Sequence, residues 1–133
     1  MKKLRGYIFS RNFYDERVPQ HIQNKILREY CNTNGLLYLL SATEYTIKES
    51  SLMLNKIIRE MKEIDGLIFY SIFQLPKNNE IRNKVYKKII NSRKEIHFAV
   101  EEMKLKEHSD VDEIEHILQI KEYLPNCLKS LKI

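Results

Sequence analysis

Short apolar runs alternate with helix-like apolar repeats along this chain, and this alternation restricts its fold more than any other feature. The apolar runs are typical of buried strands and span Leu4–Ser10, Leu36–Leu40, Leu67–Ile72 and Ile96–Val100. Between them, apolar residues recur every three or four positions, which predicts helices at Pro19–Asn34, Glu49–Ile64 and Asn79–Ser92, and a last helix from Asp110 that stops at Pro125. Strands that alternate with helices form a parallel sheet with right-handed crossovers.

The predicted fold is therefore α/β, in three layers and doubly wound. We expect a mainly parallel sheet of about four strands in the flavodoxin-like order 2-1-3-4. Residues 1–125 would form a single domain and residues 126–133 a C-terminal tail. The chain has 133 residues, 43% of them hydrophobic, so it can bury a core without disulfides, and its two cysteines are expected to be reduced.

Composition also excludes several kinds of site. The three glycines, Gly6, Gly35 and Gly66, all fall at strand or helix boundaries, which leaves none for a phosphate-cradling loop. The four histidines have no metal-ligand spacing, and the mid-strand position of His97 predicts a satisfied core histidine or an interface histidine. We expect no cofactor and no metal. The apolar runs are too short for a signal peptide or a membrane span, so the sequence favours a cytoplasmic protein.

Ligands of open α/β sheets bind beyond the carboxyl ends of the strands. Arg11 and Arg17 bracket the first loop beside a helix N-terminus, an arrangement that favours an anion pocket. The alternative, equally weighted, is that both arginines pair with Asp15 and Glu16. The other residues expected to bind substrate are Gln20, Gln23, Ser41, Thr43, Tyr45, Ser71 and Gln74.

Three residues are candidates for catalysis. Ser10 ends the first strand and could act as a nucleophile, with His21 in the first helical turn as its base. Glu44 is a second candidate acid or base. The alternative for Ser10 is a hydrogen bond to loop backbone, and for Glu44 a role as an arginine partner.

Basic residues gather at Lys77–Lys94, where seven Lys or Arg accompany the single acidic residue Glu80. A basic helix can follow nucleic-acid phosphates. A solvated lysine-rich face is the commoner meaning, so nucleic-acid binding is the least favoured hypothesis.

Four stretches resemble the catalytic domain of serine recombinases, the resolvases and invertases. They are Gly6-Tyr7-Ile8-Phe9-Ser10-Arg11, Gln20–Gln23, Ser41-Ala42 and the segment from Ile64 to Lys77. The resemblance, over residues 5–120, implies a resolvase-like fold. The family's serine aligns with Arg11, and its phosphate-holding arginines align near Ser51 and with Gln74 and Lys77. We therefore infer the fold from this resemblance and not the recombination reaction.

Other stretches resemble a small bacterial family, the sporadic carbohydrate cluster proteins. They are Arg5–Arg11, Arg17–Asn24, Tyr38–Tyr45 and Tyr70–Pro76. This resemblance implies a role in surface-polysaccharide biosynthesis and supplies no reaction.

Two functions remain open. The leading hypothesis is an enzyme or accessory enzyme that binds or transforms an anionic sugar intermediate, a sugar phosphate or nucleotide sugar, at the carboxyl edge of the sheet. The alternative is a non-catalytic scaffold subunit that uses a degenerate recombinase-like fold to form a homodimer.

Overall fold

The computed structural model describes residues 1–10, 18–44 and 52–131, except for the side chains at 52–53 and 122–131. The strands are β1 (Lys3–Phe9), β2 (Leu37–Glu44), β3 (Gly66–Phe69), β4 (Glu95–Phe98) and β5 (Met103–Leu105). The α-helices are α1 (Gln20–Thr33), α2 (Leu52–Arg59), α3 (Asn79–Asn91) and α4 (His108–Leu131). Two short 3₁₀ turns, η1 (Met61–Glu63) and η2 (Ile72–Gln74), follow α2 and β3.

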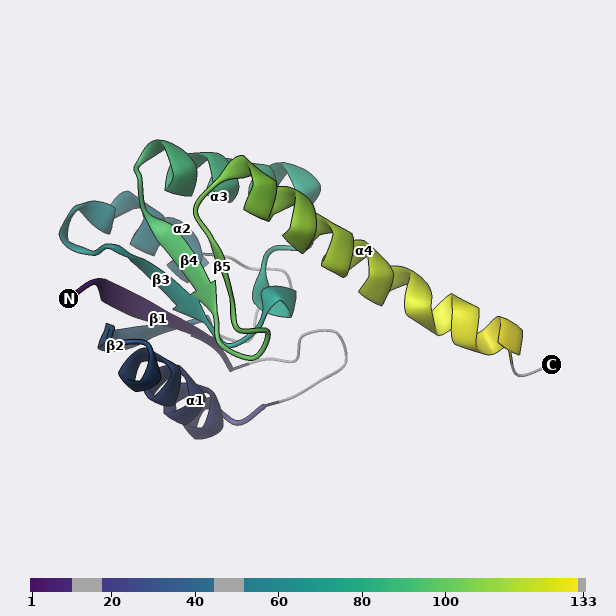
Figure 1. The fold of residues 1–133 in the computed structure, drawn as a ribbon, viewed down its shortest axis with the longest axis horizontal. Helices are drawn as coiled ribbons and strands as arrows, with labels where there is room; N and C mark the ends of the chain where they lie inside the picture. Colours follow the sequence, from purple (N-terminus) through teal and green to yellow (C-terminus); the bar gives the residue numbers. More distant parts are fainter. Residues whose placement is uncertain (11–17, 45–51, 132–133) are drawn as a thin grey trace.

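The strands form one five-stranded sheet in the order β2-β1-β3-β4-β5. The first four strands are parallel, so the predicted order 2-1-3-4 is confirmed for them. Helix α1 covers one face of the sheet, and α2 and α3 cover the other (Figure 1). The three-layer α/β architecture is therefore as predicted, and it places the carboxyl ends of β1, β2 and β3 along one edge.

Each face of the sheet has its own apolar core, because successive side chains of a strand point to opposite faces. On the α1 side, Leu4, Ile8 and Ile68 pack with Leu27 and Cys31 of the helix. The larger core on the opposite side is built around Tyr7, Phe69 and Phe98, whose rings lie in contact.

Strand β5 is additional to the sheet of about four strands that the sequence predicts. It pairs antiparallel with β4, so that Met103 lies opposite Phe98 and Leu105 opposite Ile96. A run of three residues gives little periodicity, and the pairing depends on the turn before it, where Glu102 takes a φ of 53°.

Two helices end elsewhere than predicted. Helix α2 ends at Arg59 and gives way to η1, although the pattern predicts a helix to Ile64. Helix α4 passes through Pro125 and continues to Leu131 (Figure 1), so proline does not stop it. A proline inside a helix costs about 3 kcal/mol, which the other hydrogen bonds of a 24-residue helix can offset.

The first half of α4 is fixed to α3 by an ion pair. Both Arg82 Nε and Nη2 donate to the Glu115 carboxylate, at distances down to 2.8 Å. The remaining guanidinium nitrogen, Nη1, donates to the backbone carbonyls of Pro76 and Lys77 at 3.1 Å. One of the seven basic residues in the Lys77–Lys94 run is thus engaged within the fold.

Gly66 provides a test of how closely β3 and β4 pack. A Cβ atom built on Gly66 would overlap the carbonyl oxygen of Glu95 in the neighbouring strand. Gly66→Ala should therefore force the strands apart and lower the free energy of unfolding by about 3 kcal/mol. This value is at the upper end of the range typical of overpacked cores. Gly35→Ala is the control, because a Cβ there meets no atom within 4 Å and costs only the strain of a φ of 67°. Urea unfolding should show the larger loss for Gly66→Ala; equal losses would contradict the packing argument.

Candidate functional site

Most of the predicted site residues lie at the carboxyl edge of the sheet or in the first turn of α1. The ones within the described ranges there are Ser10, Gln20, His21, Gln23, Thr43, Glu44, Ser71 and Gln74. Arg11, Arg17 and Tyr45 fall outside the described residues, so the predicted arginine pair remains a prediction.

Gln23 is fully buried, and its amide is surrounded by partners. Its Oε1 accepts hydrogen bonds from the Phe9 N–H at 3.0 Å and from Gln74 Nε2 at 2.8 Å. Its Nε2 donates to the carbonyl oxygens of Phe9 and Val18, at 2.8 and 2.7 Å. A primary amide has two lone pairs and two N–H groups, so all four positions are engaged. Gln23 therefore has a structural role, in which it joins the end of β1 to α1. We do not include it among the residues of the proposed binding site.

Gln74 and Ser71 belong to the same buried network. Gln74 Oε1 accepts from the Tyr70 N–H at 2.9 Å, and the Ser71 hydroxyl accepts from the Phe73 N–H at 3.2 Å. The Ser71 hydroxyl also donates to Glu101 Oε2 at 2.7 Å. These bonds cap η2 and fix the turn that follows β3.

Ser10 and Glu44 bring the ends of β1 and β2 together. The Glu44 carbonyl oxygen accepts from both the Ser10 N–H and the Ser10 hydroxyl, at 2.9 and 3.1 Å. Among the described residues, the Ser10 hydroxyl has no hydrogen bond to His21, the base predicted for it. The Glu44 side chain is 1% exposed, so it does not face solvent.

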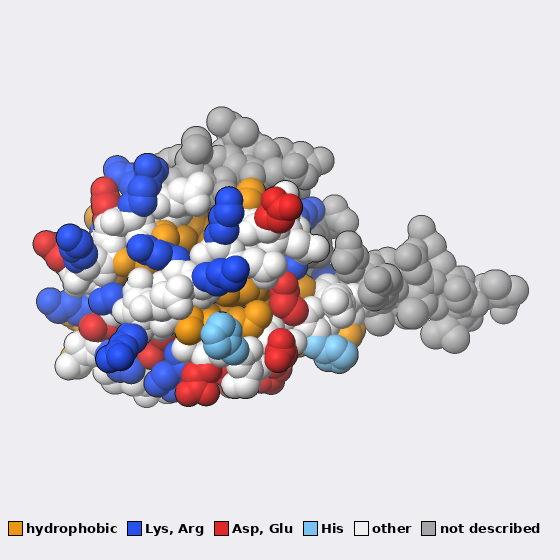
Figure 2. Space-filling view, turned by 90° about the horizontal axis from the view of Figure 1, so that it is seen from above, with side chains coloured by type: hydrophobic (Ala, Val, Ile, Leu, Met, Phe, Trp, Pro, Cys, Tyr) orange, Lys and Arg blue, Asp and Glu red, His pale blue; other side chains and the backbone are white. Residues whose placement is uncertain are grey.

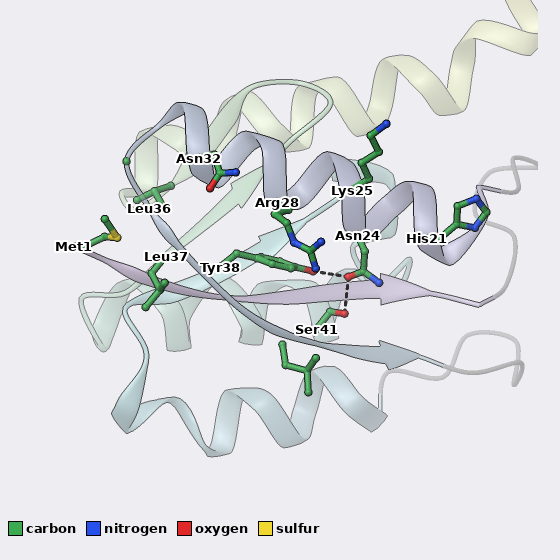
Figure 3. A pocket seen from close by; sticks show the side chains of 12 residues that line it. Met1, His21, Asn24, Lys25, Arg28, Asn32, Leu36, Leu37, Tyr38 and Ser41 are labelled. Carbon is green, nitrogen blue, oxygen red and sulfur yellow. Dashed lines mark hydrogen bonds between the residues drawn. The ribbon is translucent and has the colours of Figure 1, made fainter.

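A groove of about 830 Å³ runs between α1 and the edge strand β2 (Figure 3). His21 lies near its carboxyl-edge end, and Met1 lies at the opposite end. The helix supplies a polar and cationic wall of His21, Asn24, Lys25, Arg28 and Asn32. The chain that leads into and forms β2 supplies a wall with more apolar surface: Leu36, Leu37, Tyr38, Leu40 and Ser41.

Asn24 organises the middle of the groove. Its Oδ1 accepts hydrogen bonds from the Tyr38 hydroxyl at 2.6 Å and from the Ser41 hydroxyl at 2.8 Å (Figure 3). Burial raises the pKa of Tyr38 despite the opposing effects of Ser41 and Arg28, so the phenol stays protonated and donates. Because both lone pairs of Oδ1 are used, the Asn24 amide nitrogen is the part that can contact a ligand.

Arg28 and Lys25 give the groove its positive charge. The Arg28 guanidinium lies over the Tyr38 ring, 5.9 Å from its centroid, and both cationic side chains are exposed. Sequence reasoning named His21 and Ser41 but missed Asn24, Arg28 and Tyr38. A signal was present, since His21, Asn24 and Arg28 recur at helical spacing beside the buried stripe of α1.

A second polar cluster lies at the amino edge of the sheet. His97 Nε2 lies 2.8 Å from Glu95 Oε1, and its Nδ1 lies 2.8 Å from the Tyr30 hydroxyl of α1. Lys2 donates to the other Glu95 oxygen at 3.0 Å. Both His97 and Glu95 are 5% exposed, so this pair is enclosed, and His97 is a satisfied core histidine, one of the two roles that the sequence predicts.

Burial and pairing shift the pKa values of this cluster. Desolvation lowers the pKa of His97 below 6.5, and the neighbouring Glu95 carboxylate offsets this only in part. Burial alone would raise the pKa of Glu95, but hydrogen bonds from His97 and Lys2 outweigh it and lower the pKa below 4.5. The folded state therefore favours neutral His97 beside ionised Glu95.

Within the described ranges, no three or more His, Cys, Asp or Glu side chains are grouped so that they could hold a metal ion. None of the helices described is both long and apolar enough to cross a membrane.

Replacement of Gln23 tests whether the amide network holds the carboxyl edge together. Gln23→Met keeps the length of the side chain but removes the hydrogen bonds of the Gln23 amide to the Phe9 N–H, to two carbonyl oxygens and to the Gln74 amide. Each unsatisfied buried group costs about 1–3 kcal/mol, so we expect a loss of roughly 3 kcal/mol in urea unfolding after partial relaxation. Gln20→Met on the exposed side of the same helical turn should change stability by less than about 0.5 kcal/mol. A loss below about 1 kcal/mol for Gln23→Met would argue against the network.

Acidification should destabilise the protein through His97. Because its folded pKa is depressed, the unfolded chain binds more protons below about pH 6.5, so stability is fully present above that pH and falls as the pH drops toward 5. The slope should reach at most about 1.4 kcal/mol per pH unit for one proton. His97→Gln should flatten the pH dependence of urea unfolding between pH 7 and 5, whereas the exposed-site control His21→Gln should leave it unchanged. An unaltered slope in His97→Gln would assign the pH dependence to other groups.

Comparison with known proteins supports the fold and does not assign a family. No protein-family profile matches the chain, and no curated protein matches it either. Among solved structures, the chain is similar to the "N-terminal Catalytic Domain of TP901-1 Integrase", with a TM-score of 0.58 and 12% sequence identity. The match covers 92% of this chain and 98% of that domain. At this identity the likeness shows a shared recombinase-like fold; the predicted membership of the sporadic carbohydrate cluster family has no support from these comparisons.

Proposed function

We propose that this protein binds an anionic sugar, a sugar phosphate or nucleotide-activated sugar, in the groove between α1 and β2. The observation that carries the proposal is the difference between the two walls. The α1 wall offers Lys25 and Arg28 to an anionic group and Asn24 to hydroxyl groups, while β2 offers the Tyr38 ring as an apolar contact. Small-molecule sites combine apolar contact area with a few well-placed polar groups in this way.

The location agrees in part with the carboxyl-edge site that the sequence favours. His21 lies in the first turn of α1, close to where Gln23 contacts the end of β1, so one end of the groove opens at that edge. The sequence resemblance to proteins of carbohydrate clusters is the reason that we name a sugar as the carrier of the negative charge. The dipole of α1 also favours an anion near its N-terminus.

His21 is the residue that we propose as acid or base where the ligand is also transformed. It lines the groove and is exposed, whereas Glu44 is buried and the Ser10 hydroxyl donates to a backbone carbonyl. The proposal concerns ligand binding, and it applies equally to an enzyme and to a non-catalytic carrier.

Removal of the Arg28 charge tests the proposal. Arg28→Gln should weaken binding of hexose 1-phosphates and nucleotide sugars by about tenfold or more, since a hydrogen bond to a charged group contributes about 1.5–3 kcal/mol. Lys88→Gln on exposed α3 removes an equal charge outside the groove and should bind as the unaltered chain does. Isothermal titration calorimetry measures both, with the uncharged hexose as a ligand control. Equal affinities in Arg28→Gln and Lys88→Gln would exclude the groove as the anion site.

The scaffold hypothesis is favoured by a separate observation on the same edge strand. β2 ends the sheet, and its Leu40 and Leu37 are 84% and 42% exposed. The pairing register of β1 and β2 shifts between Arg5 and Tyr7 of β1. Leu40 lies in the resulting bulge of β2, which points its side chain outward. An exposed apolar edge strand is a place where another chain can pair. If β2 forms the scaffold contact, light scattering should show a dimer for the unaltered chain and a monomer for Leu40→Gln.

Nucleic-acid binding receives less support. The face seen in Figure 2 carries many Lys and Arg side chains, but Asp and Glu side chains lie among them. Arg82, in the basic run of α3, is already paired with Glu115. We therefore rank this function below the sugar-binding and scaffold hypotheses.

A further inference from the structure

A second cavity, of about 340 Å³, lies on the face of the sheet opposite α1. Arg5 of β1 enters it from the sheet, Arg59 from the end of α2, and Lys62 from η1. Glu60, Glu63, Ile57 and Ile64 complete its lining. None of these residues takes part in the groove between α1 and β2, so the two sites are separate.

Arg5 occupies a position that fixes where its side chain must go. It pairs with Leu39 of β2 on one side and Leu67 of β3 on the other, so its backbone is held between two strands. Its side chain shares a face with Tyr7, which packs in the core beneath α2 and α3, because alternate residues of a strand point the same way. The guanidinium is therefore brought to the cavity by the register of the sheet and not by a surface loop.

The Arg5 Nε atom is shielded from solvent and has no hydrogen-bond partner among the described residues. It is the one buried side-chain nitrogen or oxygen in that part of the chain with this property. Buried polar groups in folded proteins almost always have a partner, so an unpaired one needs an explanation, and a bound ion is one of those that apply.

The carboxylates nearby do not supply that partner. Glu60 and Glu63 line the same cavity, but within the described ranges neither forms an ion pair with Arg5, Arg59 or Lys62. Arg59 Nε donates to the Asn55 carbonyl at 3.4 Å, a local helix contact. Three cations therefore face the cavity against two carboxylates, and its net charge is positive.

We propose that this cavity binds a small oxyanion of the phosphate class, either inorganic phosphate or a small phosphate monoester. Phosphate oxygens match the forked N–H groups of a guanidinium, and the two further cations come from separate elements that surround the cavity. The Arg5 side chain already lines the cavity, and because its Nε atom is shielded, the side chain must rotate for the Nε–H to reach the ligand. Binding then gives the unpaired donor the acceptor that it lacks.

The experiment follows the Arg5 side chain directly. Inorganic phosphate is titrated into the ¹⁵N-labelled protein while the Arg5 Nε–H signal is recorded, and the dissociation constant is measured in parallel by calorimetry. We expect this signal to shift with saturation, and Arg5→Met to weaken phosphate binding at this site by at least tenfold. Arg28→Gln, in the groove, should leave the Arg5 shift unchanged, so failure of the sugar-binding proposal and failure of this one can be told apart.

A second variant guards against loss of folding in Arg5→Met. Arg59→Gln combined with Lys62→Gln alters exposed residues only and should also weaken phosphate binding by at least tenfold. Glycerol 3-phosphate and acetate, titrated in the same way, separate a phosphate-monoester site from a general anion site: binding of acetate as tight as that of phosphate would overturn the assignment to phosphate. An Arg5 signal that ignores phosphate, with Glu60→Gln and Glu63→Gln each destabilising the chain, would show that Arg5 pairs internally and would overturn the proposal.

Discussion

The buried amide of Gln23 is the interaction on which the carboxyl edge of the molecule depends. It holds the end of β1, the start of α1 and the turn after β3 in one hydrogen-bonded unit. Its position also sets the angle of α1 on the sheet, because Leu27 and Cys31 follow it along the same buried stripe. That angle leaves the adjacent helix face, with Asn24 and Arg28, opposite β2 and so creates the groove.

The two sites that we propose use opposite faces of the same sheet. The groove depends on α1 and the outer strand β2, while the smaller cavity depends on Arg5 of β1 and the end of α2. Both follow from side-chain alternation along β1, since Leu4 and Ile8 face α1 whereas Tyr7 faces the other core. Both proposed anion sites are lined mainly by residues of helices, strands and η1, consistent with the rule that function resides in sites and not in folds.

Prediction from the sequence succeeded where the pattern is local and repeated. The order of β1 to β4 follows from the alternation of strands and helices, and the burial of His97 follows from its apolar neighbours Ile96 and Phe98. It was wrong at Pro125, because helix propensity is a local rule and α4 continues past the proline. It also missed β5, which is too short to carry a period and exists through its pairing with β4.

The sequence by itself determined the class of fold, the layers and the edge at which polar residues collect. Only the tertiary structure decided which of those residues face one another. Gln23 and Gln74 are 51 positions apart, yet their amides meet in the core, and Asn24 meets Tyr38 and Ser41 across the gap between a helix and a strand. Periodicity says which face a residue occupies, whereas its partner depends on the helix angle and strand register, which many distant contacts set together.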